Sequence, residues 1–377
     1  MSTERKTTTE DLLAQGRALV PWFLDVQVTP EVSTRDFTDV PYPDSFGRVM
    51  LTDPRDRFMS TLRKLYPEGL AGRSVLDCAC NCGGFLFWAR ELGAGRCHGI
   101  DVREHWIEQA NFLLANRAAP SEAITFELRD VYDLPAAGLE PFDVVVFYGI
   151  FYHLPEPITG LKAAADMTRE VLIINTSTTI GIGDGQLAVS FESVRRPITG
   201  IYGLRWFPSG PQMLIRILAW LGFSEVRVNW WRLPPEDVVP GTGKLELIAA
   251  RSAEALRSFD LADAERPPLQ RMIENSVPPG ATVLVAAPEG DKSLDVDARE
   301  TVPFPTDGRE AADDAELIAE LIRRRGEGAD YLLIPRASAP WLGQHRDLHK
   351  YIRKSYTRIA REEGVGVLFT LLPTWMM

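Results

Sequence analysis

Long apolar runs are missing from this sequence of 377 residues. No stretch reaches the roughly 20 apolar residues that a membrane-spanning helix needs. The polar opening "MSTERKTTTE" lacks the apolar run of a secretory signal. Cysteine is scarce too, because the chain has only 4, and three of them crowd into one stretch. A disulfide framework is therefore not expected, and we expect a cytoplasmic protein with no membrane partner.

Basic residues are in the minority, with 41 Lys and Arg against 52 Asp and Glu and a net charge of −11. Non-specific binding of nucleic acid depends largely on Lys and Arg, whereas an acidic surface repels phosphate. The charge balance therefore predicts that nucleic acid is an improbable partner. The overall composition, 45% hydrophobic and 25% charged, is typical of a globular protein, and the length suits two or three domains.

From about residue 73, short apolar runs alternate with helix-length amphipathic segments. This pattern predicts a mostly parallel sheet covered by helices on both faces. The long irregular stretch after Thr176 predicts a lid or binding loop, and two strands joined by a Pro- and Gly-rich turn close the unit. A smaller α/β alternation follows. We expect a helical and irregular segment at 1–50, an α/β domain at 51–255 and a C-terminal α/β domain at 265–377.

The stretch "SVLDCACNCGGFLF" follows the pattern of a strand, a tight turn and a helix. Ligands of open α/β sheets bind outside the carboxyl ends of the strands. Small residues there let backbone N–H groups approach a nucleotide, and asparagine tolerates positive φ better than most residues. Asp77, Ala79, Asn81 and Gly83 have the spacing that such a turn requires.

Two other interpretations of this stretch stay open. Alternating Cys78, Cys80 and Cys82 suggest a metal site, but such a site needs about four ligands in a closed geometry. We therefore predict no metal, and expect the cysteines to fill a tight turn. Ala79, Asn81 and Gly84 also imitate a G-x-G-x-x-G dinucleotide turn, against which the long loop and the final pair of strands argue.

Polar residues follow the next strands as well. Asp101, with Val102 beside it, is placed to accept the hydroxyl protons of a ribose. Asp130 would hold an adenine together with the backbone N–H of Val131. The stretch after the fourth strand supplies candidates for the reaction itself, namely Tyr148, Tyr152 and His153.

Together, "VLDCACNCGG", "GIDVREHWIEQA", "LRDVYDLP" and "FDVVVFYGIFYHLPEPI" resemble the class I S-adenosylmethionine-dependent methyltransferases. Within them, "GIFYHLPEPI" and "RWFPSGPQMLIRILAWLGFSEVRV" resemble the enzymes that form methoxy and carboxymethoxy groups on the tRNA wobble uridine. The resemblance covers the part of the chain before the C-terminal unit. It implies a seven-stranded Rossmann-like sheet of order 3-2-1-4-5-7-6, with an antiparallel seventh strand, and S-adenosylmethionine as cofactor.

The resemblance also implies roles for single residues. The turn from Asp77 to Gly83 would surround the methionyl part of the cofactor, with Tyr148 nearby, and Arg55 or Arg57 would pair with its carboxylate. Two departures from the family stand out. Ala79 occupies a usual glycine position, and Trp206 stands where the carboxymethyl-transferring members carry a tyrosine, which makes a carboxylated cofactor less expected.

His153 is the best candidate for a general base, because the unperturbed pKa of histidine lies near neutral pH. The alternative is a structural histidine that anchors the loop after the fourth strand. Tyr202, Arg205 and Trp206 are candidates for binding the substrate, or else they pack the lid.

The function that follows is methyl transfer from S-adenosylmethionine, with a sugar or another small natural-product molecule as the expected acceptor. The acidic charge supports this choice, as does a C-terminal unit that resembles a module found beside bacterial glycosyltransferases. Modification of the tRNA wobble uridine is the alternative, and it predicts a basic patch around Arg195, Arg196 and Arg205. A non-catalytic cofactor-binding protein is a second alternative, and a homo-oligomer is compatible with any of the three.

Overall fold

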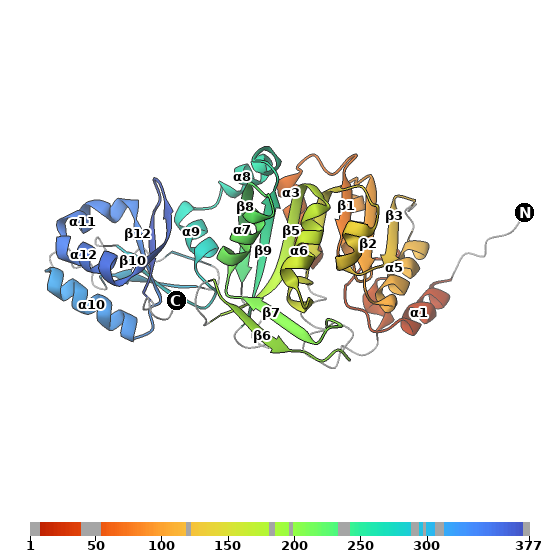
Figure 1. Ribbon diagram of the computed structural model, residues 1–377, viewed down its shortest axis with the longest axis horizontal. Coiled ribbons are helices and arrows are strands. Elements are labelled where there is room, and N and C mark those ends of the chain that lie inside the picture. Colours follow the sequence, from red (N-terminus) through yellow and green to blue (C-terminus); the bar gives the residue numbers. More distant parts are fainter. Residues whose placement is uncertain are drawn as a thin grey trace, which may run out of the picture.

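The structure, a computed structural model, describes residues 8–38, 54–117, 122–180, 185–195, 199–232, 242–287, 294–296, 299–305 and 313–371. Two sheets lie side by side along the long axis of the molecule, each with its own helices (Figure 1). None of the helices in these ranges is long and apolar enough to cross a membrane.

The larger sheet has seven strands in the order β3-β2-β1-β4-β5-β9-β8. Strands β1 to β5 are parallel, and β9 runs antiparallel to both of its neighbours. This confirms the expected order, since β8 and β9 are the sixth and seventh strands once a separate hairpin is set aside. The strands are β1 Ser74–Asp77, β2 Arg96–Asp101, β3 Ile124–Leu128, β4 Phe142–Tyr148, β5 Thr168–Thr179, β8 Glu225–Arg232 and β9 Thr242–Ala250.

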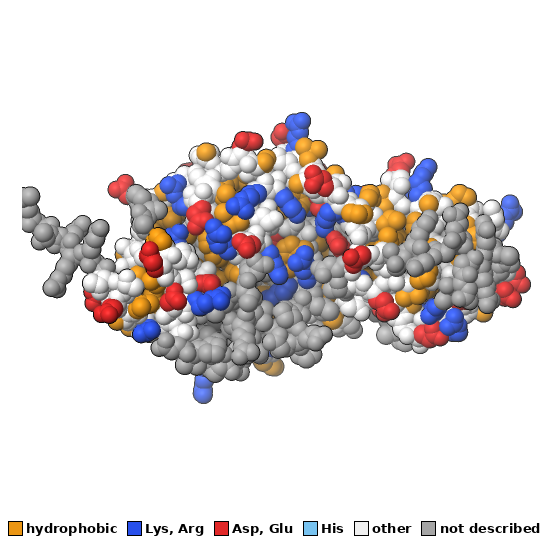
Figure 2. Space-filling model, turned by 180° about the vertical axis from the view of Figure 1, so that it is seen from behind, with side chains coloured by type: hydrophobic (Ala, Val, Ile, Leu, Met, Phe, Trp, Pro, Cys, Tyr) orange, Lys and Arg blue, Asp and Glu red, His pale blue; other side chains and the backbone are white. Residues whose placement is uncertain are grey.

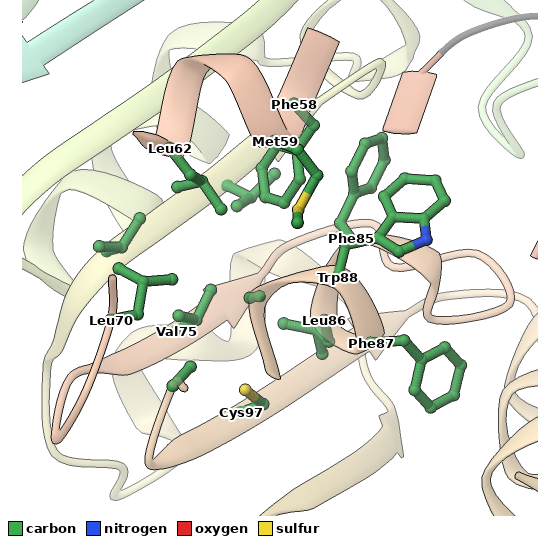
Figure 3. Close-up of a cluster of buried hydrophobic side chains, with 14 of the residues drawn as sticks. Phe58, Met59, Leu62, Leu70, Val75, Phe85, Leu86, Phe87, Trp88 and Cys97 are labelled. Atoms are coloured by element: carbon green, nitrogen blue, oxygen red, sulfur yellow. The ribbon is translucent and has the colours of Figure 1, made fainter. Parts of the chain in front are cut away.

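Helices cover both faces of this sheet, which is why its central strands are continuously apolar. In β4, Val144 and Val146 pack on one face, whereas Val145 and Phe147 pack on the other. The first face carries α1 Thr9–Ala18, α3 Pro54–Leu65, α4 Gly84–Glu91, α5 Glu104–Asn116 and α8 Arg257–Asp263. The second carries α6 Pro157–Asp166 and α7 Pro211–Trp220. Figure 3 shows how α3 and α4 meet on the first face, through residues that include Phe58, Leu62, Leu86 and Trp88.

A two-stranded hairpin occupies the region expected to be a long loop. Its strands are β6 Leu187–Phe191 and β7 Leu204–Pro208. It crosses one end of the large sheet (Figure 1) and packs against β5 and the short helical turn Phe151–His153. The sequence hides these strands because neither shows a buried face, and Phe191 is 85% exposed. The expected covering element is therefore present as an ordered hairpin.

The smaller sheet has five strands in the order β11-β10-β12-β14-β13. The expected α/β alternation holds up to α12, but the segment after it forms an antiparallel strand pair and does not continue the helix. Helix α9 lies between the two sheets (Figure 1). The elements are α9 Pro268–Ser276, β10 Thr282–Ala286, β11 Glu300–Phe304, α10 Asp314–Gly326, β12 Tyr331–Pro335, α11 Ala339–Gln344, α12 Arg346–Ser355, β13 Thr357–Glu362 and β14 Gly366–Thr370.

Candidate active site

The turn after β1 has the backbone that a close approach to a ligand needs. Asn81 has a φ of 49° and Gly83 a φ of 83°, the left-handed region that asparagine and glycine tolerate. A Cβ on Gly83 would also lie 2.3 Å from the ring of Phe126. Ala79 is not among the residues with positive φ, so that the departure from glycine at this position costs the turn nothing.

The cysteines of this turn are packing residues. Cys78, Cys80 and Cys82 are buried, and burial raises the pKa of each thiol, to about 12 for Cys82. Cys78 and Cys82 face opposite sides of the sheet. Within the described ranges, no group of three or more His, Cys, Asp and Glu residues is arranged to hold a metal ion. Neutral thiols that point apart are poor metal ligands.

Asp77 ends β1 with an unusually isolated carboxylate. Its side chain is fully buried, and Oδ2 has no hydrogen-bond partner among the described residues. Burial raises its pKa to about 8; the Ala79 N–H opposes this rise and the nearby Asp101 adds to it. A buried acceptor without a partner is costly unless a ligand completes it. Its chemistry fits a cationic donor such as an ammonium group.

Asp101 ends β2 and links two strand-end loops. It accepts hydrogen bonds at 3.0 Å from the backbone N–H groups of Asn81 and Arg103. Burial raises its pKa to about 6, although these hydrogen bonds oppose the shift. Each carboxylate oxygen keeps a further lone pair, which suits a pair of ribose hydroxyls. Val102 beside it is 40% exposed, and so lies open to a ligand.

Asp130 follows β3 and caps the helical turn Val131–Ala136 by accepting from the Tyr132 N–H. Its other oxygen accepts the hydroxyl of Tyr202, which comes from the segment before β7. Val131 is buried on the α6 face. The structure therefore brings a predicted substrate residue, Tyr202, onto the predicted adenine residue, Asp130.

The segment Thr199–Tyr202 forms a strap across the strand ends. The carbonyl of Thr199 accepts from the guanidinium of Arg103, which follows β2. The N–H of Gly200 donates to Glu192 at 2.9 Å, beside His153. With the Tyr202 hydroxyl on Asp130, the strap contacts the loops after β2, β3 and β4. The hairpin thereby closes the edge at which the sequence places the site.

His153 pairs with a carboxylate that the sequence did not indicate. Its Nδ1 lies 2.8 Å from Oε1 of Glu192, whose side chain is only 2% exposed. Burial lowers the pKa of His153, and the hydrogen bond to Glu192 works against that shift. An Nδ1–H that donates to Glu192 leaves Nε2 as the basic nitrogen. Tyr152 packs its ring on His153 and on Phe207 of β7.

Tyr148, at the end of β4, faces away from these groups. Its hydroxyl donates to Oε2 of Glu246 on β9. Oε1 of Glu246 accepts from Thr61 at 2.9 Å and from Asn229 at 2.6 Å. Burial raises the pKa of both Tyr148 and Glu246. This buried network was also invisible in the sequence, because its members come from four separate elements.

Three further predicted residues are placed as follows. Arg55 pairs with Glu91 at 2.7 Å, at the opposite end of α4 from Gly83, and so is not brought to the turn. Arg205 and Trp206 lie on β7 with buried Nε and Nε1 atoms that have no hydrogen-bond partner in the described part of the chain. Unpaired buried donors of this kind fit acceptor atoms of a ligand.

The chain is similar to known methyltransferases in sequence and in fold. Residues 75–171 match the family described as a methyltransferase domain. A tRNA U34 carboxymethyltransferase of Pseudomonas fluorescens (strain SBW25) is 32% identical over 162 residues, covering 42% of this chain and 48% of the relative. Its namesake from Campylobacter lari is 34% identical over 168 residues, covering 44% and 54%. The chain thus spans about half the length of the curated relatives it matches.

Among solved structures, the N-terminal domain of EvdMO1 with SAH bound has a TM-score of 0.52 to this chain. The two are 19% identical, and the match covers 66% of this chain and 99% of that one. At this identity the likeness shows the fold alone, and it agrees with the strand order described above.

The names of the sequence relatives overturn one expectation. An excess of acidic residues predicted that nucleic acid is an improbable partner, whereas these relatives are named for tRNA. Net charge averages over a whole surface, but contacts are screened beyond about 8 Å at physiological salt, so the local charge at the site decides the partner.

The strand order, the turn after β1 and the sequence match agree: the chain contains a class I S-adenosylmethionine-dependent methyltransferase domain.

Proposed function

We propose that this protein transfers a methyl group from S-adenosylmethionine to tRNA, at an oxygen of the wobble uridine. The observation that carries the proposal is the 32% to 34% identity to tRNA U34 carboxymethyltransferases. A plain methyl group is favoured over a carboxymethyl group, because Trp206 stands where the carboxymethyl-transferring enzymes carry a tyrosine. The expected sugar or natural-product acceptor is not retained, since it rested largely on net charge.

Each residue at the strand ends suits a different chemical group of the cofactor. Asp77 offers its unpaired buried oxygen to the α-ammonium group, and Asp101 offers acceptors to the ribose hydroxyls. Asp130 and the Val131 N–H suit the adenine, provided that the Tyr202 hydroxyl leaves Asp130. When bound, the sulfonium supplies an electrophilic methyl group and leaves as a neutral thioether. The protein's own task is to hold the acceptor oxygen in line and to take its proton.

His153 is proposed as the group that takes this proton. Nδ1 of His153 lies 2.8 Å from Glu192 and 3.1 Å from the Gly200 N–H. In the tautomer that carries its proton on Nδ1 and donates it to Glu192, Nε2 is the proton acceptor, as in other histidine bases that a buried carboxylate orients. Burial lowers the pKa of His153, which favours the neutral ring that can accept a proton. The ring of Tyr152 lies 4.1 Å from this ring at an angle of 48° and positions it from the side.

Replacing Asp101 by alanine is expected to weaken S-adenosylhomocysteine binding about 10- to 100-fold, because hydrogen bonds to a charged acceptor contribute about 1.5–3 kcal/mol. The backbone N–H groups of Asn81 and Arg103 also lose their acceptor. Calorimetric titration measures the effect. The exposed Asp133→Ala variant is the matched control and should bind as the wild type does. Equal affinities for the two variants would contradict the assignment of Asp101.

The proposed function is tested by transfer of a labelled methyl group. The full chain is incubated with S-adenosylmethionine and with tRNA whose wobble uridine carries a free hydroxyl group on its base in place of a methoxy or carboxymethoxy group, and the nucleosides are then analysed by mass. One added methyl group on the wobble uridine is expected, and the yield should fall at limiting S-adenosylmethionine when Asp101→Ala replaces the wild type. Label that enters small sugar acceptors while tRNA stays unlabelled would refute the proposal, as would the absence of transfer to any acceptor.

A further inference from the structure

A cleft of about 390 Å³ lies between α3 and β8 of the large sheet and the start of the C-terminal domain at α9. Strand β8 runs parallel to β1 to β5, so Trp230 and Arg232 at its end lie at the same edge of the sheet as the strand ends of the methyltransferase site. Five Lys and Arg side chains line the cleft against two carboxylates, Asp56 and Glu274. Figure 2 shows several Lys and Arg side chains near the middle of the molecule as seen from behind, with Asp and Glu side chains among them.

The five cations fall into two groups. Arg266 and Arg299 are structural, because Arg266 pairs with Asp263 and Glu274, and Arg299 donates to backbone carbonyls of Glu274 and Val277. Arg57 and Arg232 are exposed, and both lie near the ring of Trp230, at 5.7 and 6.0 Å from its centre. Lys64 lines the cleft beside them. Guanidinium groups held over one aromatic ring suit phosphate, which they bind in a bidentate manner.

The wall of this cleft is connected to the predicted site. Thr61 and Asn229 line the cleft, and both donate to Oε1 of Glu246. Oε2 of the same carboxylate accepts the hydroxyl of Tyr148, which ends β4 next to the methyltransferase turn. Trp231 is fixed by a 3.0 Å hydrogen bond to Thr178, while Trp230 remains partly exposed. Hydrogen bonds thus connect the end of β4, through Glu246, to the strand that carries Trp230.

We propose that this cleft binds the sugar–phosphate backbone of the RNA acceptor, with phosphate on Arg57 and Arg232 and a nucleobase able to stack on Trp230. The inference rests on the proposed function, and it identifies the cleft as the part of the protein that holds the tRNA substrate. Phosphate contacts of this kind position a nucleic acid without reading its sequence. Stacking on an aromatic ring likewise tolerates any base. The basic patch predicted around Arg195, Arg196 and Arg205 stays a prediction, separate from this cleft, and Arg196 lies outside the described residues.

The test measures binding of fluorescein-labelled tRNA to the full chain by anisotropy, at about 50 and about 200 mM salt. Arg57→Gln/Arg232→Gln is expected to lose at least about tenfold in affinity. It should also reduce the slope of log K against log salt by about 1.4 to 1.8, which is one phosphate contact for each lost cation. Arg57→Lys/Arg232→Lys should recover most of the salt dependence. Arg353→Gln, on the exposed side of α12, is the matched control and should behave as the wild type.

Binding of S-adenosylhomocysteine, unchanged within about twofold, shows that each variant is folded. If the double glutamine variant binds tRNA with wild-type affinity and salt dependence, the cleft is not the RNA site, and methyl transfer to tRNA is judged separately. A wild type that does not bind tRNA at about 50 mM salt also overturns the inference. If tRNA binds through the cleft but takes up no methyl group, the cleft assignment stands and the proposed reaction fails.

Discussion

Replacing His153 by glutamine is expected to lower the rate of methyl transfer about 100- to 10,000-fold, the usual contribution of a positioned general base. Glutamine keeps a donor that can reach Glu192 but has no basic nitrogen. The hairpin contact is therefore retained while the proton acceptor is lost. S-adenosylhomocysteine affinity should stay within about twofold, since the strand-end carboxylates Asp77 and Asp101 are untouched.

The pH profile separates a base from a structural anchor. The wild-type single-turnover rate should rise with pH through the pKa of His153, which burial lowers from its ordinary value, and then level off. Glu192→Gln should shift this rise to lower pH, because the carboxylate that favours the charged ring is gone. His153→Gln should lose the rise altogether. A His153→Gln variant with wild-type rate and pH profile would show that the residue only anchors the hairpin.

The strand-end carboxylates were predictable because their signal is local. Asp77 and Asp101 are the last residues of β1 and β2, and Asp130 comes two residues after the end of β3. Parallel strands present their carboxyl ends at one edge of a sheet. Topology therefore brings them together without any knowledge of side-chain packing. The turn after β1 was predictable for a similar reason, since asparagine and glycine are the residues that most readily adopt the positive φ found at Asn81 and Gly83.

The partners of the candidate catalytic residues were not predictable. Glu192 lies 39 residues from His153, and Glu246 lies 98 residues from Tyr148. The residues next to Glu192 and Glu246 in the sequence do not indicate that either is buried. Their burial results from the packing of the hairpin against β5 and the turn after β4, and from the pairing of β9 with β5. The cationic cleft was hidden in the same way, as its residues come from α3, β8 and the approach to α9. A net charge of −11 says nothing about such a local cluster.

Replacing Asp77 by asparagine is expected to stabilise the protein at alkaline pH while impairing cofactor binding. Burial raises the pKa of this carboxyl from 3.8 to about 8. The folded state therefore holds a proton that the unfolded state has released, and stability falls as pH rises from about 4 to about 8. Above that range the buried charge costs roughly a few kcal/mol, at 1.36 kcal/mol for each pKa unit. Asparagine has no such charge.

The thermal midpoint of Asp77→Asn should therefore exceed that of the wild type at pH 9, and the difference should shrink toward pH 4. Exposed Asp133→Asn is the control and should show no such trend. Equal midpoints for Asp77→Asn and the wild type across this range would contradict the raised pKa of Asp77.

Cofactor binding should release the proton that the buried Asp77 side chain holds in the cofactor-free protein. At pH 7 most Asp77 side chains are protonated, and an ammonium group placed at Oδ2 favours the ionised form, so binding should release up to about one proton. Calorimetry of S-adenosylhomocysteine in two buffers of different ionisation enthalpy counts that proton, and affinity should rise from pH 6 to 8. Asp77→Asn should bind at least about tenfold more weakly and release fewer protons than the wild type. A proton count unchanged by the substitution would place the ammonium group elsewhere. The ionised Asp77 side chain destabilises the folded protein without cofactor, and the same side chain pairs with the ammonium group when the cofactor binds. Asp77→Asn should therefore raise the stability of the protein at alkaline pH and lower its affinity for the cofactor.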